Sequence, residues 1–331
     1  MSGIKPLLLS VFLLTTAVNY GQFTDVINSN RPGESMGAFS VGKTVVQAEL
    51  GFYTFRENQN LTKYNAEGVG SDLQVRYGAF FEQLEIILDA QYQNEVYKDL
   101  DRLTSQRNAG FKELSLGAKY LVYDPMKNYE KKPNLYSYNA NHRFSFRQFI
   151  PAVGVYAGFN IDMAKGKFDR PGYPEENGFS PTIGLLTQNQ FGKMVLVMNV
   201  MADQLATQRE SFDYVVTLTY GINMRWSGLL EHQGYISDFY SDAIFRAGAA
   251  YLPMENIQID ATIGSNIKNT PSVLIAGIGL SWRFDANYNE VMLRIPKEKG
   301  SKDDKKKKDK KDKAKKRLDA IENGTDPDKA K

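Results

Sequence analysis

Cysteine is absent from this chain of 331 residues, and histidine and tryptophan are each present only twice. The lack of cysteine excludes disulfides, thiolate metal sites, thiol catalysis and the lipidated N-terminal cysteine of a bacterial lipoprotein. His142 and His232 have no serine, aspartate or metal-ligating partner at a useful spacing. No G-x-S-x-G, H-E-x-x-H or glycine-rich phosphate-binding motif occurs. The sequence therefore predicts no enzyme, no cofactor and no metal site.

Long apolar runs are also missing beyond the start of the chain. Residues 1–21 are typical of a secretory signal peptide, with Lys5 as the positive start, a short apolar stretch at 6–18 and cleavage before Gln22. That stretch is too short to cross ~30 Å of hydrocarbon. No other run of about 18 apolar residues follows. If the exported chain sits in a membrane, it must cross it with strands.

The sequence does contain segments in which apolar residues alternate with small or polar ones, most clearly at 271–284. Every second residue of this segment is apolar, ending in Trp282 and Phe284, while the residues between them are small or, at Arg283, charged. A period of two predicts a β-strand. Because the chain becomes polar after Phe284, we expect this to be the last strand and to pair with the first one, at 44–56.

The same period recurs in twelve segments, and in each the face assigned as outward holds almost no charge. A soluble β-sandwich would carry charge freely on its solvent face, and a mean hydropathy of -0.42 is compatible with a barrel whose lumen and loops are polar. The predicted fold is all-β, a transmembrane antiparallel β-barrel over 44–284. The expected strands are 44–56, 69–80, 84–93, 110–123, 149–161, 179–191, 194–203, 212–225, 229–236, 243–252, 256–264 and 271–284.

The connections between these segments alternate between short and long. Short turns face the periplasm in bacterial barrels, so an even number of strands places both termini there. Residues 22–43 are accordingly expected to be an N-terminal periplasmic segment. The connection 124–146 is long although it falls on the short-turn side, which means either a periplasmic excursion or a wrong strand count. The longer outer loops are predicted at 58–68, 96–109, 162–178 and 204–211.

The faces assigned as inward collect the charged residues and some of the tyrosines. Two interpretations stay open: ion pairs that plug and stiffen a closed barrel, or a polar pore whose charges and tyrosines sort solutes. A barrel of this size has room for a narrow channel at most. The predicted lumen-lining residues are Glu49, Tyr53, Arg76, Glu85, Asp89, Glu113, Lys119, Tyr156, Arg225, Glu231, Arg246, Asp260 and Arg283.

Residues 285–331 hold 16 Lys and Arg against 11 Asp and Glu, a net charge of +5 within an overall +3. With Lys5 removed as part of the leader, residues 22–284 carry a net charge of -3. The tail is interpreted as a disordered Lys-rich periplasmic segment. Its partner would be an acidic periplasmic protein or peptidoglycan. Nucleic acid is not a predicted partner, because the chain is exported.

The N-terminal sequence SNRPGES at 29–35, followed by VGK at 41–43 and VQAELGF at 46–52, resembles the opening of an outer-membrane transporter family of the phenol-degradation (meta-cleavage) pathway. That opening has an Asp-Arg-Pro core and then Gln-x-Glu-x-Gly-Phe, and Asn30 stands in place of the aspartate. The resemblance implies a barrel that admits small, often hydrophobic or aromatic, molecules, and it supplies no catalytic residues. The cleavage context and the tail are similar to those of exported Bacteroidota proteins.

The leading functional hypothesis is a passive channel or transporter for small solutes in the outer membrane of a Gram-negative bacterium. The alternative is a non-conducting accessory barrel of an outer-membrane assembly or secretion complex, which docks periplasmic partners through its basic tail. Besides outer-membrane lipid, the barrel assembly machinery is an expected partner. Trp282 and Phe284 resemble the C-terminal aromatic signal read by the barrel assembly machinery, although 47 residues follow Phe284 here.

Overall fold

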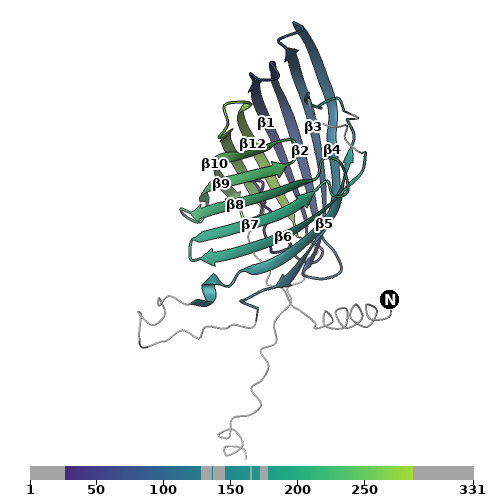
Figure 1. Ribbon diagram of the computed structural model, residues 1–331. Coiled ribbons are helices and arrows are strands. Elements are labelled where there is room, and N and C mark those ends of the chain that lie inside the picture. The colour runs from purple at the N-terminus through teal and green to yellow at the C-terminus, as the bar shows by residue number, and fades with distance from the viewer. Residues whose placement is uncertain (1–26, 128–135, 137–145, 165, 172–177, 286–331) are drawn as a thin grey trace, which may run out of the picture. The chain divides into compact units, whose positions relative to one another are not determined.

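The computed structural model describes residues 27–127, 136, 146–164, 166–171 and 178–285 (Figure 1). The predicted signal peptide, the Lys-rich tail beyond Asp285 and His142 lie outside the described residues. Within those ranges, no helix is long and apolar enough to cross a bilayer.

The fold is a closed barrel in which every strand pairs antiparallel with its neighbours in sequence, and the last strand pairs with the first. The register of that closing pair runs from Val46 opposite Phe284 to Asn58 opposite Ser272. The predicted barrel and its closing pair are therefore confirmed. Its elements are β1 (Val46–Gln59), β2 (Tyr64–Gly78), β3 (Leu84–Asp99), β4 (Thr104–Tyr123), the 3-10 turn η1 (Phe146–Phe149), β5 (Ala152–Asp162), β6 (Ser180–Phe191), β7 (Met194–Asp203), β8 (Ser211–Gly221), β9 (Trp226–Ser237), β10 (Ser241–Met254), β11 (Ile257–Asn266) and β12 (Ser272–Phe284).

The two faces of the wall are inverted relative to a soluble protein. Outward side chains such as Phe52 and Ile278 are 54% and 62% exposed, whereas the inward neighbours Glu49 and Arg76 are buried. An exposed apolar band around a closed barrel is what a lipid environment requires, because the closed sheet leaves no backbone edge unpaired.

The first four strands are longer than the sequence pattern predicted, and they form hairpins that end in tight turns at 60–63 and 100–103 (Figure 1). The loops predicted at 58–68 and 96–109 are therefore mostly strand. The alternation fades there because both faces are polar: Glu67 pairs across strands with Arg56 and Lys98, and all three side chains are exposed. Strand pairing continues after the lipid-facing pattern has ended.

The N-terminal segment has a position that the alternating pattern does not predict. Its described part, 27–43, lies inside the barrel against the inward faces. Ala38, for example, is fully buried in a cluster with Leu121 of β4 and Ala152 of β5. The segment has no alternating pattern, so the surface that it contacts cannot be predicted from its residues.

Candidate lumen site

One end of the lumen, where β1 begins and β12 ends, is called the short-turn end. It is filled by a buried ion network on β1 to β4. The Arg76 Nε lies 2.6 Å from Glu85 Oε1, and its Nη1 lies 3.0 Å from Glu49 Oε1. Lys119 Nζ lies 3.3 Å from Glu85 Oε2. These four side chains are no more than 1% exposed. Two positive and two negative charges satisfy one another, as buried charges must.

The same charged groups hold the backbone of the N-terminal segment. Glu85 Oε2 accepts a hydrogen bond from Val41 N at 2.9 Å, and Glu49 Oε2 accepts one from Arg31 N at 3.2 Å. Lys119 Nζ donates to the carbonyl oxygens of Gly37 and Phe39 at 2.9 and 3.0 Å. An irregular segment inside a barrel cannot pair its amides with a strand. The inward side chains take that role.

A second cluster lies on β9 and β10. Arg246 Nη1 donates to Glu231 Oε1 at 2.9 Å and to Gln233 Oε1 at 2.6 Å. Glu231 Oε2 accepts from the Glu34 backbone N at 2.9 Å and from Thr217 Oγ1 at 2.8 Å. The N-terminal segment is thus bound to both sides of the lumen.

Arg31 reaches from this segment to the seam where the barrel closes. Its Nη1 donates to Asp72 Oδ2 of β2 at 2.5 Å, and its Nε and Nη2 point to the two oxygens of Asp260 of β11, each at 3.4 Å. Between these carboxylates lie Gly51 of β1 and Gly279 of β12, over which the guanidinium sits.

Other inward carboxylates make no ion pair with a described residue, although the charge of Lys112 acts on Glu113. Asp89 accepts from Gln74 Nε2 at 3.0 Å, Glu113 accepts from Ser115 Oγ at 3.1 Å, and Asp203 accepts from Asn160 Nδ2 at 2.9 Å. In the described ranges these three groups make no ion pair, and no three His, Asp or Glu side chains are grouped so as to hold a metal ion. This part of the wall is electrostatically negative.

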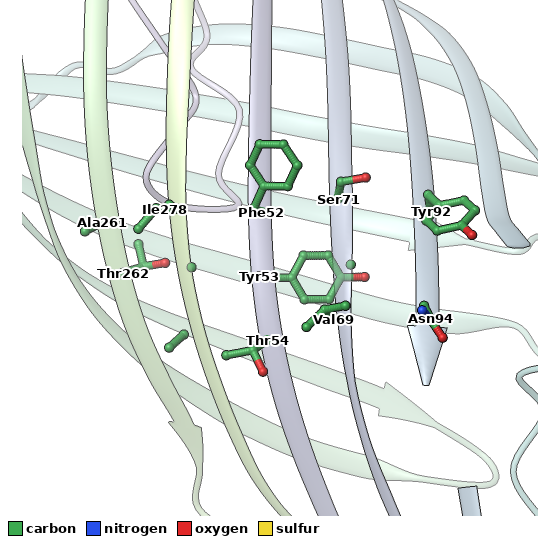
Figure 2. Close-up of a pocket in the computed structure, with 13 residues that line it drawn as sticks. Phe52, Tyr53, Thr54, Val69, Ser71, Tyr92, Asn94, Ala261, Thr262 and Ile278 are labelled. Carbon is green, nitrogen blue, oxygen red and sulfur yellow. The ribbon is translucent and has the colours of Figure 1, made fainter. Parts of the chain in front are cut away.

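Both predicted lumen tyrosines lie over glycines. A Cβ on Gly70 of β2 would lie 2.2 Å from Tyr53 Cζ, and a Cβ on Gly117 of β4 would lie 2.3 Å from Tyr156 Oη. Figure 2 shows Tyr53 reaching from β1 toward β2. Its hydroxyl donates to Gln93 at 3.3 Å and accepts from Gln91 at 3.0 Å. These glycines leave room for rings that lie flat along the wall.

The opposite mouth is crossed by Arg170, from the connection between β5 and β6. Its guanidinium donates to Glu95 at 3.0 Å through both Nη atoms and to Glu57 at 3.1 Å through Nε. It also lies 5.6 Å from the centre of the Tyr64 ring and 5.8 Å from that of Tyr97. A bidentate pair with ring contacts is a specific arrangement for arginine.

Of the predicted lumen residues, Arg225 lies outside the lumen and Arg283 lies at the end of a strand. Arg225 is exposed in the turn 222–225, because the Asn223 side-chain oxygen accepts from the backbone N atoms of Arg225 and Trp226, each at 2.8 Å, and ends β8 four residues early. Its assignment to the lumen was wrong. Arg283 is buried at the end of β12, 3.6 Å from Asp285.

The outer wall carries the remaining predicted residues and a groove. Trp282 and Phe284 face outward with their ring centres 5.8 Å apart. A groove of about 790 Å³ crosses β3, β2, β1, β12 and β11 (Figure 2), and most of its lining side chains, including Phe52, Val69 and Ile278, face outward. It is a depression in the lipid-facing surface, and the inward residues Tyr53 and Thr262 also contribute to its lining.

The sequence pattern missed the residues that bring the lumen together. Arg31, Asp72 and Arg170 were not singled out as lumen residues. Gly51 and Gly279 could have been found, since an inward glycine in two strands expected to pair indicates a side chain from elsewhere filling the space.

A sequence model of the family described as "Putative MetA-pathway of phenol degradation" matches residues 29–284. Among solved structures, an outer-membrane channel from Pseudomonas putida F1 aligns with a TM-score of 0.50 and 10% identity, over 78% of this chain and 100% of that one. The translocator domain of the autotransporter NalP from Neisseria meningitidis gives 0.46 and 9%, over 72% and 88%. The CymD monoaromatic hydrocarbon channel gives 0.41 and 10%, over 73% and 89%. A search of curated protein sequences found no match.

Proposed function

The chain belongs to this phenol-degradation family, and from that premise we propose that it is a passive channel for small solutes in the outer membrane of a Gram-negative bacterium. The observation that carries the proposal is the division of the wall: an apolar outer band faces lipid, and a charged inner face surrounds a segment held mainly by polar contacts.

In the proposed orientation both ends of the barrel domain face the periplasm. Val46 and Phe284 are register partners, so β1 begins where β12 ends. The two-residue connections at 192–193 and 255–256 are on this same end, together with the long connection 124–151. The opposite end has the longer connections 163–179 and 204–210 as well as the tight turns 60–63 and 100–103. Short periplasmic turns are the usual arrangement in outer-membrane barrels.

The resting channel in this proposal is closed at the N-terminal segment. Arg76, Glu85 and Lys119 are fully buried at that level, so water does not reach them. Passage of a solute requires the segment 27–43 to move. It can do so without breaking a strand pair, because it is not part of the sheet: it is held by polar contacts with inward side chains, by the packing of Ala38, and by a backbone hydrogen bond from Ile27 N to the Glu255 carbonyl in a turn.

The proposed solutes are small, and neutral or cationic ones are favoured over anions. Asp89, Glu113 and Asp203 present negative charge and make no ion pair in the described part of the chain. Rings of carboxylates favour cations in channels. Aromatic solutes are compatible with Tyr53 and Tyr156 on the wall, and with the family's description.

A non-conducting accessory barrel is the second candidate, and the filled short-turn end is the observation that favours it. In that role the basic tail would bind a periplasmic protein or peptidoglycan, and Trp282 and Phe284 would serve only recognition by the assembly machinery.

Conductance in planar bilayers separates the two candidates. Both the full mature chain and a chain ending at Asp285 are expected to show salt-dependent openings, with a reversal potential that indicates cation preference in a salt gradient. Silence of both proteins would contradict the channel and favour the accessory role.

A further inference from the structure

Four inward positions on neighbouring strands form one continuous row across the closing seam. Asp72 of β2 is the register partner of Gly51 of β1, Gly51 is the partner of Gly279 of β12, and Gly279 is the partner of Asp260 of β11. Neighbouring strands lie about 4.8 Å apart, so the two aspartates are separated by roughly 14 Å of wall. The row therefore has a carboxylate at each end and two glycines, which have no side chain, between them.

The bare centre of this row has the size of a guanidinium group. A Cβ on Gly51 would lie 2.1 Å from Arg31 Nη1, and a Cβ on Gly279 would lie 2.1 Å from Arg31 Nε. Neither glycine has the positive φ that would itself favour glycine. The requirement at both positions is thus space for a ligand rather than backbone conformation.

The row also supplies acceptors to each nitrogen of the group. Nη1 is bound by Asp72, Nε and Nη2 by the two oxygens of Asp260, and Nη2 also by the Ile278 carbonyl at 3.4 Å. A planar fork with several donors reaches both carboxylates, whereas a single ammonium over the glycine floor cannot. The site selects shape as well as charge.

Three features make Arg31 a replaceable ligand. It belongs to the irregular segment, so its departure breaks no strand pair. Its side chain is 14% exposed and that of Asp72 is 32% exposed, so solvent reaches the site. The Asp260 side chain is unexposed, and without Arg31 two carboxylates would remain uncompensated. The vacated row retains affinity for a cation of the same shape.

We propose that the row Asp72, Gly51, Gly279 and Asp260 is a guanidinium-binding site, that Arg31 is its resident ligand, and that a solute bearing a guanidinium group opens the lumen by taking the place of Arg31. The binding site stands on the geometry alone. The opening step rests on the proposed channel function.

Calorimetry on purified, folded protein tests the site, with ethylguanidinium as the probe and ethylammonium as the control of equal charge. Arg31→Ala should bind ethylguanidinium about tenfold more tightly than ethylammonium, the size expected for one charge-assisted hydrogen bond. The double variant R31A/G279A, whose floor is filled by a methyl group, should lose this preference. Equal affinity for the two cations in R31A, or an undiminished preference in R31A/G279A, would overturn the site.

Conductance of the wild-type chain tests the opening step and needs no variant, so it decides even if R31A fails to fold. Ethylguanidinium, far below denaturing concentrations, should raise the open probability about tenfold over the same concentration of ethylammonium. Arg225→Ala, which removes an exposed arginine of a turn, should respond like the wild type. Equal responses to the two cations would overturn the opening step. Silence of wild type and R31A under all conditions would instead contradict the channel, while the calorimetry would still decide the site.

Discussion

Segments from different parts of the chain cross the two ends of the lumen, and they are held in different ways. At the short-turn end, 27–43 is held by Glu49, Glu85 and Lys119, which are essentially unexposed and share one ion network. At the loop end the contact crossing the mouth is Arg170, a side chain that is 15% exposed. One closure is a network built into the wall, and the other is a clamp on a connection.

The difference indicates which end contributes to the stability of the barrel and which end can move while the barrel stays intact. A network of buried charges is costly to break, because each lost partner leaves an unpaired charge. A clamp on a connection can be lost while the barrel stays intact. Burial alone lowers the pKa of Arg170, but its hydrogen bonds to Glu95 and the charges of Glu57 and Glu95 outweigh burial and raise the pKa. The clamp therefore keeps its positive charge at any physiological pH.

The largest effect is expected from Arg76→Ala, at the network end. The substitution leaves Glu49 and Glu85 without their shared cation and should lower the free energy of unfolding by about 3–5 kcal/mol. Denaturant titration of the folded barrel in lipid measures it. The control Arg225→Ala removes an exposed turn arginine and should stay within about 0.5 kcal/mol of the wild type. Equal midpoints for the two variants would mean that the network carries no stability.

A smaller effect is expected from Arg170→Ala, at the clamp end. The variant loses its hydrogen bonds to Glu57 and Glu95, which are ~1.5–3 kcal/mol each when a charged group is involved. Because these contacts hold a connection, we expect faster proteolysis between β5 and β6. The unfolding midpoint should also fall, since the unexposed Glu95 loses its cation, but by less than in Arg76→Ala, because Glu95 keeps its hydrogen bonds from Gln93 and Asn108.

The matched control for this clamp is Arg102→Ala, which removes an exposed arginine 3.8 Å from Asp99 at a hairpin tip. Its proteolysis should equal that of the wild type. If Arg170→Ala were as resistant as this control, the loop end would not be clamped by Arg170.

The twelve strands and their inward faces could be predicted because lipid imposes a simple pattern. In each membrane-crossing stretch, lipid-facing and inward-facing residues must alternate. This alternation predicts the inward positions of Glu49, Arg76 and Glu231. The register of strand pairing is not contained in such a pattern. Gly51 and Asp72 become neighbours only when β1 and β2 are aligned, so the row that holds Arg31 could not be seen in advance.

The irregular segments were beyond prediction for a related reason. Residues 27–43 have no period, and their position is fixed by contacts with side chains distant in sequence, such as Glu231 with the Glu34 amide. Arg225 shows the opposite error. Alternation continued past the end of β8, and the local hydrogen bonds of Asn223 decided the turn.

The smallest expected effect concerns the outer face rather than either end of the lumen. Phe284→Ala should reduce the amount of protein assembled in the membrane, since Phe284 resembles the aromatic signal for barrel assembly. A chain ending at Asp285 should assemble normally. Quantification of the heat-modifiable barrel in membrane fractions measures both. Loss of assembly in the shortened chain, with Phe284→Ala unaffected, would place the signal in the tail.

Closure of a conducting lumen by the N-terminal segment can be tested by locking that segment in place. A Cβ on Gly154 of β5 would lie 3.6 Å from the Cα of Ala38, close enough for a disulfide, and the chain contains no other cysteine. Bilayer conductance of the double variant A38C/G154C is recorded before and after a reductant is added. If the segment closes the lumen, the oxidised form is silent and openings appear after reduction. Equal conductance in both forms would contradict it.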